Sequence, residues 1–312
     1  MARSWLEFKT DAWVQWCPGC GDFGILNAFH RALAELDIDP SNLVLVGGIG
    51  CSGRITYYVK GSNIHSLHGR AIPVASGVKL ANPHLTVVVA GGDGDLLGIG
   101  AGHFVAAGRR NMDITIILHD NAVYGLTKGQ AAPTLPSWWQ TKALAGPNLQ
   151  DNLNPLLLAF ASGYTFIARG YAYHTNQLKE LIKEAIRHKG TALVDILQPC
   201  PTYNNIMTNK WYEERIYYLN EEDPEWNPVI TSDLDFKEKA PRILEKMVEW
   251  GDRIPLGIFY KDLRKDTFHT RLEKVMPGYM KHPPATRPIS VEGKPIADPW
   301  TVFKDRVVKK PE

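Results

Sequence analysis

Apolar positions along the first two thirds of the chain follow two alternating patterns, one typical of helices and one of buried strands. Apolar residues at helical spacing predict helices at 23–36, 71–81, 154–161 and 175–188, and a helix rich in small residues is expected at 96–107. Continuous apolar runs predict strands at 43–46, 85–90, 114–118, 164–168 and 192–197. A polar loop over 119–146 separates the two halves of this pattern. Unbroken apolar strands indicate a sheet that is covered on both faces.

The alternation of strands and helices predicts an α/β fold with a doubly wound, mostly parallel sheet, in which ligands bind at the carboxyl ends of the strands. We expect one domain over 1–205 and a C-terminal extension over 206–312 that packs on the body or on a partner. The extension begins with an acidic, proline-broken stretch, and its expected elements are a helix at 236–250 and a strand at 256–260. Its end is rich in proline and charge.

Composition narrows the function to small-molecule chemistry. The chain has 312 residues, 44% of them apolar, and its 35 basic and 33 acidic residues leave a net charge of +2 and no basic face for nucleic acid. The N-terminus has no apolar stretch of signal-peptide length, and no segment approaches the roughly 20 apolar residues that would span a bilayer. A cytoplasmic protein is therefore expected. In a reducing compartment its cysteines are ligands or reactive groups rather than disulfides.

Two polar segments follow neighbouring buried strands. Gly92-Asp93-Gly94 ends one apolar run, and Asn121 follows the next. Because one strand–helix–strand crossover separates them, Asp93 and Asn121 are expected close together at one sheet edge. A carboxylate, an amide oxygen and a loop carbonyl suit Mg²⁺, and glycines beside a helix N-terminus suit a diphosphate. Each piece alone is equally explained as an Asp-Gly turn or an Asn cap, but together they predict a magnesium and diphosphate site.

The segment from Gly92-Asp93-Gly94 to Asn121-Ala122-Val123-Tyr124-Gly125 resembles the diphosphate-binding motif of thiamine diphosphate enzymes. This resemblance implies Mg²⁺ held by Asp93, Asn121 and the Val123 carbonyl. It further implies that the residues near the cofactor include Gly94, Asp95, Gly125 and Leu126. Asp95 is also suited to cap the helix that follows it.

A second glycine-rich stretch, Gly48 to Gly53, fits the fingerprint of dinucleotide-binding folds and follows a strand. That fingerprint requires an acidic residue about twenty positions further on to bind a ribose. The segment 69–74 contains none. A nicotinamide site is therefore the weaker hypothesis for this stretch.

The chain has four cysteines, Cys17, Cys20, Cys51 and Cys200. The first two form a Cys-x-x-Cys turn, and the other two follow predicted strands, at the edge expected to carry the magnesium site. By number alone four thiolates suit a [4Fe–4S] cluster and a structural zinc equally well. Next to thiamine diphosphate, oxidative decarboxylation of a 2-oxoacid releases electrons, and a cluster can accept them.

Three further motifs are Trp16-Cys17-Pro18-Gly19-Cys20-Gly21-Asp22, Gly48-Ile49-Gly50-Cys51-Ser52-Gly53-Arg54 and His68-Gly69-Arg70-Ala71. Together with the thiamine motif they make residues 12–205 resemble the β subunit of two-subunit, archaeal-type 2-oxoacid:ferredoxin oxidoreductases. The resemblance implies a [4Fe–4S] cluster on the four cysteines. It also implies conversion of a 2-oxoacid, CoA and oxidised ferredoxin to an acyl-CoA, CO₂ and reduced ferredoxin.

The same resemblance assigns individual roles. The residues implied to touch the cofactor are Ile49, Gly50, Cys51 and Ser52, and His68 is implied to lie near its diphosphate. Arg54 is a candidate for pairing with the substrate carboxylate, and Lys128, on a glycine-flanked loop, for gating the site. Arg54 is explained equally well by an ion pair with an acidic neighbour. Lys128 is explained equally well as a lysine that is simply exposed to solvent.

No glutamate in the chain is marked as the carboxylate that thiamine catalysis requires for deprotonation of the cofactor. In the family this residue comes from an α subunit that carries the pyrimidine-binding domain, so we expect such a partner, with ferredoxin as the electron acceptor. The alternative function is a non-redox thiamine diphosphate decarboxylase or synthase subunit with a structural zinc. A zinc-stabilised binding module without catalysis is the third hypothesis.

Overall fold

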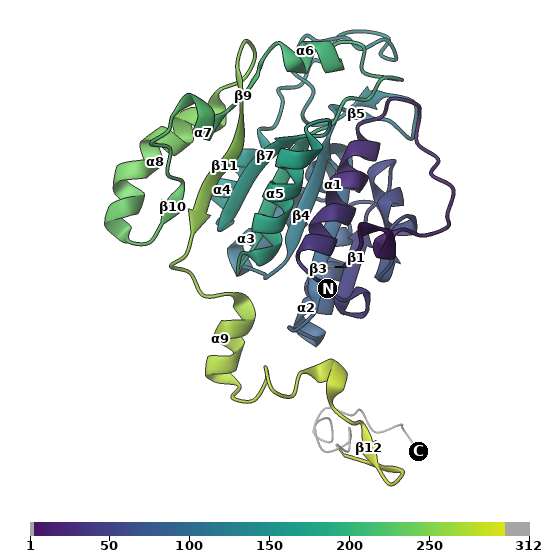
Figure 1. Cartoon of the computed structure of the whole chain (residues 1–312), viewed down its shortest axis with the longest axis vertical. Helices are drawn as coiled ribbons and strands as arrows, with labels where there is room; N and C mark the ends of the chain where they lie inside the picture. Colours follow the sequence, from purple (N-terminus) through teal and green to yellow (C-terminus); the bar gives the residue numbers. More distant parts are fainter. Residues whose placement is uncertain (1–2, 297–312) are drawn as a thin grey trace, which may run out of the picture.

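Parallel strands flanked by helices make up most of the molecule in the computed structural model, which describes residues 3–296 (Figure 1). The strands are β1 (Leu43–Gly47), β2 (Ser62–His65), β3 (Thr86–Gly92), β4 (Thr115–Asp120), β5 (Val123–Tyr124), β6 (Gln130–Ala131), β7 (Phe166–Tyr171), β8 (Ala192–Leu197), β9 (Ile216–Tyr218), β10 (Val229–Ile230), β11 (Ile254–Asp262), β12 (Ser290–Val291) and β13 (Lys294–Pro295). The helices are α1 (Asp22–Glu35), α2 (Ala71–Ala81), α3 (Ala101–Arg110), α4 (Pro155–Ser162), α5 (Thr175–Arg187), α6 (Asn209–Glu213), α7 (Leu219–Glu222), α8 (Asp233–Val248) and α9 (Phe268–Val275).

Within the described residues, nine strands form one sheet in the order β10-β11-β7-β8-β4-β3-β1-β2, and β9 also pairs with β11. All neighbours from β7 to β2 are parallel, whereas β11 runs antiparallel to β7. Strands β3 and β4 are adjacent, and Gly92 at the end of β3 is in register with His119 of β4. The predicted doubly wound, mostly parallel sheet is confirmed, and the segments after β3 and β4 start from the same edge.

Helices cover both faces of this sheet. Helices α1 and α5 pack on one face, and α2, α3, α4 and α8 pack on the other (Figure 1). Strand β1 shows the alternation, since Leu45 belongs to the first core and Val44 and Val46 belong to the second. Because both sets of side chains are buried, most positions of the central strands are apolar, and the exceptions, such as Arg169 and Asp195, are buried as well.

One expected helix differs from the structure. Where a single helix was predicted over 96–107, a π-helical turn (Gly94–Ile99) comes first and α3 follows. The Gly100 N–H donates to the Asp95 carbonyl oxygen, five residues back, and this wider turn begins directly after Asp93. Such π-helical turns are frequent at functional sites, and a helical apolar pattern cannot distinguish them from an α-helical turn.

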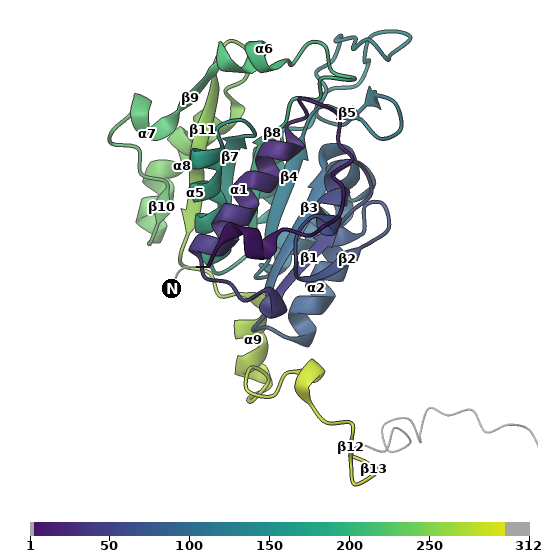
Figure 2. The same cartoon turned by 45° about the vertical axis from the view of Figure 1, so that its right-hand side comes forward.

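The chain after β8 contains several elements without a clear sequence pattern, among them α6, β9, α7 and α9. Strands β9, β10 and β11 extend the main sheet, so this region contributes to the body of the molecule up to Asp262. Among residues 3–296, the segment after α9 is the part that runs away from the sheet, as Figures 1 and 2 both show. Residues 297–312, part of the proline-rich and charged end, lie outside the described residues. None of the helices in 3–296 combines the length and the apolar character that a membrane span needs.

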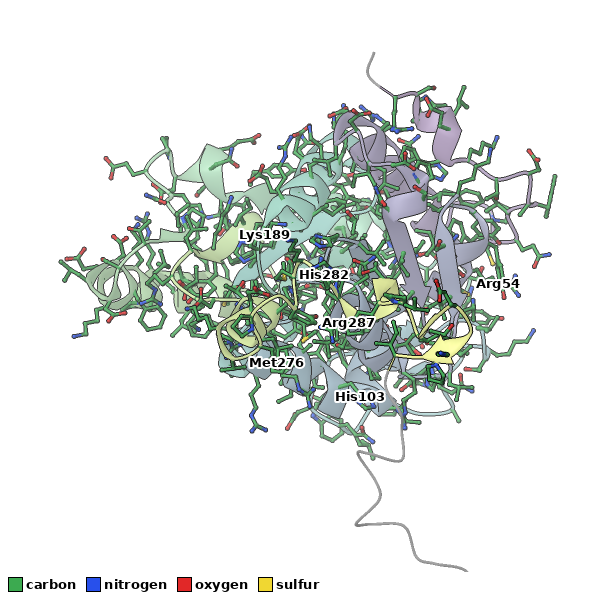
Figure 3. The ribbon with its side chains drawn as sticks, turned by 90° about the horizontal axis from the view of Figure 1, so that it is seen from below. Arg54, His103, Lys189, Met276, His282 and Arg287 are labelled. Carbon is green, nitrogen blue, oxygen red and sulfur yellow. The ribbon has the colours of Figure 1, made fainter. Side chains whose placement is uncertain are left out.

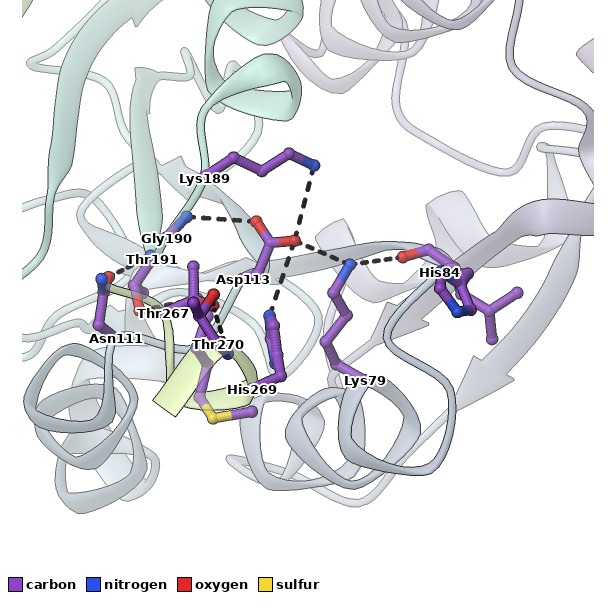
Figure 4. A network of polar contacts seen from close by, with 12 residues as sticks. Lys79, His84, Asn111, Asp113, Lys189, Gly190, Thr191, Thr267, His269 and Thr270 are labelled. Carbon is purple, nitrogen blue, oxygen red and sulfur yellow. Dashed lines mark hydrogen bonds and ion pairs between the residues drawn. The ribbon is translucent and has the colours of Figure 1, made fainter. Parts of the chain in front are cut away.

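Helix α9 lies at the amino ends of the strands, the end of the molecule seen in Figure 3. A polar network holds it there (Figure 4), in which the Asp113 carboxylate lies 3.0 Å from Lys79 Nζ, 3.9 Å from Lys189 Nζ and 3.8 Å from His269 Nε2. Burial opposes ionisation of Asp113, but His269 and the two lysines prevail and lower its pKa. The ion pair is well shielded, since the side chains of Lys79 and Asp113 are 6% and 12% exposed.

Replacing Asp113 with asparagine is expected to destabilise the fold by about 3–5 kcal/mol, because it leaves the Lys79 ammonium buried without a counter-charge. Thermal unfolding of the purified protein measures the change. The matched control is Asp266→Asn, which removes the acid of the exposed Lys274 pair and should cost about 1 kcal/mol or less. Equal shifts in the two variants would contradict a structural role for the buried pair.

Candidate active site

A cavity of about 280 Å³ opens where the loops after β1, β3 and β4 meet. The three predicted magnesium ligands, Asp93, Asn121 and Val123, all line it. So do all residues predicted to lie near the cofactor, which are Ile49, Gly50, Cys51, Ser52, His68, Gly94, Asp95, Gly125 and Leu126. The fold therefore brings together four segments that lie far apart in the sequence.

Asp93 is buried and shares the Thr134 hydroxyl with a second buried acid, Asp120. A single hydroxyl hydrogen cannot serve two carboxylates, so one of the acids is protonated and donates to Thr134 Oγ1. Burial raises the pKa of Asp93 to about 6, whereas burial and the nearby Asp195 raise the pKa of Asp120 well above its usual value. Ionisation is opposed at both acids, and Asp195 opposes it further at Asp120, whereas Asp93 is the acid that lines the cavity.

The turn after β4 arranges the other two predicted ligands. Ala122 adopts a left-handed conformation with φ 62°, and the Asn121 Oδ1 atom accepts a hydrogen bond of 3.0 Å from the Val123 N–H. The carbonyl groups of Ala122 and Tyr124 accept N–H groups from further along the β5–β6 hairpin. Because carbonyl groups alternate in direction along a strand, the Val123 carbonyl points away from the hairpin. It is thus left available to a ligand in the cavity.

Asp95 ties three segments together instead of capping its own helix. Its Oδ1 atom accepts hydrogen bonds from the Ile49 N–H at 3.1 Å, the Gly69 N–H at 2.7 Å and His68 Nδ1 at 2.8 Å. The side chain makes no capping bond to its own π-helical turn. Its Oδ2 atom is buried without a hydrogen-bond partner. This oxygen lies against the backbone of Gly48 and Gly91, neither of which lines the cavity.

The glycine-rich stretch after β1 is shaped by close backbone contacts. A Cβ atom on Gly53 would lie 1.8 Å from the Gly48 carbonyl oxygen, and a Cβ atom on Gly48 would lie 1.7 Å from Asp95 Oδ2. Side chains are therefore excluded at both positions. The stretch leads into a short 3₁₀ turn, Ser52–Tyr57, whereas a dinucleotide fingerprint opens a full helix.

A second cavity, of about 210 Å³, adjoins the first and is lined by all four cysteines. The Gly21 N–H donates to the Pro199 carbonyl at 3.1 Å, which brings the Cys-x-x-Cys turn to Cys200. Trp16 Nε1 donates to the Cys51 carbonyl at 2.7 Å and joins the same turn to the loop after β1. The residues that line both cavities are Cys51, Asn121, Gly125 and Leu126. The two cavities thus share a wall.

The thiols in this cavity are shielded from water to different degrees. Cys17 is exposed, whereas burial raises the pKa of Cys51 to about 11 and also raises the pKa of Cys20 and of Cys200. Metal ligation needs the thiolate, so a bound cation has to offset this cost. In the part of the chain that the structure describes, no three or more His, Cys, Asp or Glu side chains are grouped to hold a metal ion. The four thiols surround a cavity and do not converge on one point.

The two predicted catalytic residues differ in position. Arg54 is half-buried, lines the cysteine cavity and donates to Gln15 Oε1 at 2.6 Å. Lys128 is exposed, has φ 90° and lines neither cavity. A direct role is therefore easier to assign to Arg54 than to Lys128.

Several supporting residues are not among the predicted site residues. Thr134 and Asp120 orient Asp93, Tyr124 packs edge-on against His68, and Gln198 bonds to both Asn121 and Cys20. The strand-edge rule could have found two of them, because Asp120 ends β4 and Gln198 comes directly after β8, and Tyr124 lies within the thiamine motif. Thr134 depends on contacts that only the folded chain makes.

Comparisons with known proteins agree with this arrangement. Residues 48–196 match the family "Thiamine pyrophosphate enzyme, C-terminal TPP binding domain", and residues 200–276 match the family that describes the C-terminal part of the pyruvate ferredoxin oxidoreductase β subunit. The 2-oxoacid:ferredoxin oxidoreductase 2, subunit beta, of Aeropyrum pernix is 72% identical over 99% of each chain. The 2-oxoacid:ferredoxin oxidoreductase subunit beta of Saccharolobus solfataricus is 53% identical over 95% of this chain and 97% of its own.

A solved structure is also similar over nearly the whole chain. It is a 2-oxoglutarate:ferredoxin oxidoreductase from Magnetococcus marinus, 35% identical, with a TM-score of 0.81 over 97% of this chain and 95% of that chain. That protein has 2-oxoglutarate, coenzyme A and succinyl-CoA bound. From its sequence, fold and relatives, the chain belongs to the β subunits of the 2-oxoacid:ferredoxin oxidoreductases.

Proposed function

We propose that the first cavity binds thiamine diphosphate with Mg²⁺ and that the cysteine cavity binds a [4Fe–4S] cluster. The complete enzyme then converts a 2-oxoacid, CoA and oxidised ferredoxin to an acyl-CoA, CO₂ and reduced ferredoxin. The observation that carries this proposal is the wall that the two cavities share. It puts the site of decarboxylation directly beside the site from which electrons leave.

The residues of the first cavity fit the cofactor. Asp93 would hold Mg²⁺ together with the Asn121 amide oxygen and the Val123 carbonyl, a set of hard oxygen donors. When bound, thiamine diphosphate supplies a stabilised carbanion for attack on the carbonyl of the 2-oxoacid. His68, which Asp95 orients through Nδ1, would face the diphosphate with its other ring nitrogen.

The second cavity favours a cluster over a structural zinc. A single zinc ion bonds to sulfur at about 2.3 Å and needs its four donors close around one point. The four thiols line a cavity of about 210 Å³ instead, which leaves room for several irons and sulfides. The relatives' names include ferredoxin, an electron carrier, which also argues against the non-redox alternative.

The need for a partner is inferred from the carboxylates that line the first cavity, and the substrate class is inferred from the names of the relatives. Among the described residues that line the first cavity, the carboxylates are Asp93 and Asp95 alone, so we infer that the glutamate for cofactor deprotonation comes from an α subunit. The apolar side chains of Ile49 and Leu126 in the wall of the cavity are 37% and 43% exposed, as expected for a surface that a partner covers. The relatives are named for 2-oxoacids and for 2-oxoglutarate, so the substrate is a 2-oxoacid.

Anaerobic reconstitution with the α subunit is expected to give CoA-dependent ferredoxin reduction with a panel of 2-oxoacids, whereas the isolated β chain releases CO₂ only at background rate. The physical reason is that the isolated chain lacks the carboxylate that assists deprotonation of the cofactor. Product assays together with iron, zinc and magnesium analysis check each part. Full decarboxylation by the β chain alone would contradict the partner proposal, and zinc without iron would contradict the cluster.

A further inference from the structure

Gln198 lines the second cavity and contacts Asn121, which lines both cavities, and Cys20, which lines the second. It follows β8 directly and is only 1% exposed. Its Oε1 atom accepts a hydrogen bond of 2.7 Å from Asn121 Nδ2. Its Nε2 atom donates to Cys20 Sγ at 3.3 Å and to the Pro199 carbonyl at 2.8 Å. One buried carboxamide thus touches a predicted magnesium ligand and a predicted cluster ligand.

The orientation of this carboxamide follows from its neighbours. If its oxygen and nitrogen were exchanged, the oxygen would face the carbonyl oxygen of Pro199, and the amino group would face the amino group of Asn121. Both contacts would be repulsive. The amino group therefore belongs on the side of Cys20, and the oxygen belongs on the side of Asn121.

We propose that Gln198 is a positioning residue for both centres, because it fixes the Asn121 amide for the metal and gives an N–H hydrogen bond to the Cys20 sulfur of the cluster. This inference rests on the proposed cofactors. Neither contact of Gln198 adds charge to the site. Its effects come from the orientation of the Asn121 amide and from the N–H dipole directed at the Cys20 sulfur.

The two ends of the carboxamide have different consequences. At the oxygen end, the bond to Asn121 Nδ2 holds the amide plane and leaves Oδ1 as the atom available to a metal, as residues behind metal ligands commonly do. At the nitrogen end, an N–H bond to a ligand sulfur favours the more negative, reduced cluster and raises its reduction potential. The other side chain bonded to Cys20 Sγ is the Asp22 carboxylate at 3.5 Å, whose negative charge acts in the opposite direction.

The test is Gln198→Met in the reconstituted complex, since methionine has similar size and neither bond. The expected midpoint potential of the cluster is more negative by about 59 mV, a tenfold change in the one-electron reduction equilibrium. The apparent Kd for thiamine diphosphate at fixed Mg²⁺ is expected to rise about tenfold. An effect of this size is usual when a residue that hydrogen-bonds to a metal ligand is replaced. A redox titration followed by electron paramagnetic resonance gives the first value, and cofactor titration of the apoprotein gives the second.

Gln140→Met is the matched control, because Gln140 is exposed and lines neither cavity. It should leave both values unchanged. If Gln198→Met does not fold, as judged by its melting temperature and iron content, Gln198→Glu provides the second variant. Glutamate keeps an oxygen acceptor for Asn121 and removes the N–H donors, so at high pH the potential falls while the Kd stays within about threefold of the parent, a difference under 1 kcal/mol.

The possible results separate this inference from the function on which it rests. A parent protein without a cluster signal refutes the cluster and the inference together. A parent protein with a cluster, and a folded Gln198→Met variant with unchanged potential and Kd, refutes the inference and leaves the function intact. In Gln198→Met, a change in only one of the two values also overturns the joint role.

Discussion

Replacing Asp93 with asparagine is expected to lower the 2-oxoacid oxidation rate of the complex by about a thousandfold. Asparagine still accepts the Thr134 hydroxyl, but it removes the only charge among the three proposed magnesium ligands. A metal clamp of this kind contributes several kcal/mol, and each 1.36 kcal/mol is a tenfold change in rate. Steady-state rates over a Mg²⁺ titration should show weaker apparent metal affinity together with the lower rate.

Asp120→Asn is the matched control for this variant. Asp120 shares the same Thr134 hydroxyl and is also buried, but it does not line the cavity, and burial raises its pKa, so a neutral amide is a close replacement. Its rate should stay within about fivefold of the parent, a difference of about 1 kcal/mol. Equal losses in the two variants would show that the network supports packing and that Asp93 does not bind the metal.

Cys51→Ala is expected to abolish the cluster and reduce ferredoxin reduction to background. The alanine variant loses one of the four thiols that surround the second cavity, the one that lies in the shared wall. Iron analysis and the broad visible absorption of the anaerobically purified complex measure the loss.

Thr202→Val serves as the control for the cysteine variant, because Thr202 lines the same cavity and its replacement leaves all four thiols in place. This variant should retain iron and electron transfer. Full ferredoxin reduction by the Cys51→Ala complex would contradict the ligand assignment.

The sequence predicts the sheet and the location of the site well, because both depend on local patterns. Strands β1, β3, β4 and β8 are mostly apolar runs, and in parallel strands the residues that follow them must meet at one edge. This rule alone brings Asp93, Asn121, Cys51 and Cys200 to neighbouring cavities.

The supporting contacts could not be predicted in the same way. Gln198 and Cys20 are separated by 178 positions, and Thr134 reaches Asp93 across 41 positions. No periodicity records such pairs, because they exist only after the chain has folded. The short strands β9 and β10 are likewise held by pairing with β11 and not by their own sequence pattern.

Gly125 is one of the four residues that line both cavities. A Cβ atom at this position would lie 3.7 Å from Cys51 Sγ and 3.8 Å from Cys200 Sγ, so even alanine would touch both sulfurs. The rate of electron tunnelling falls steeply with distance. A larger side chain at this position would increase the distance between the proposed cofactor and the proposed cluster without removing any ligand. The missing side chain of Gly125 therefore leaves the space beside both sulfurs open, and residues larger than alanine at this position are expected to slow electron transfer between the two proposed centres.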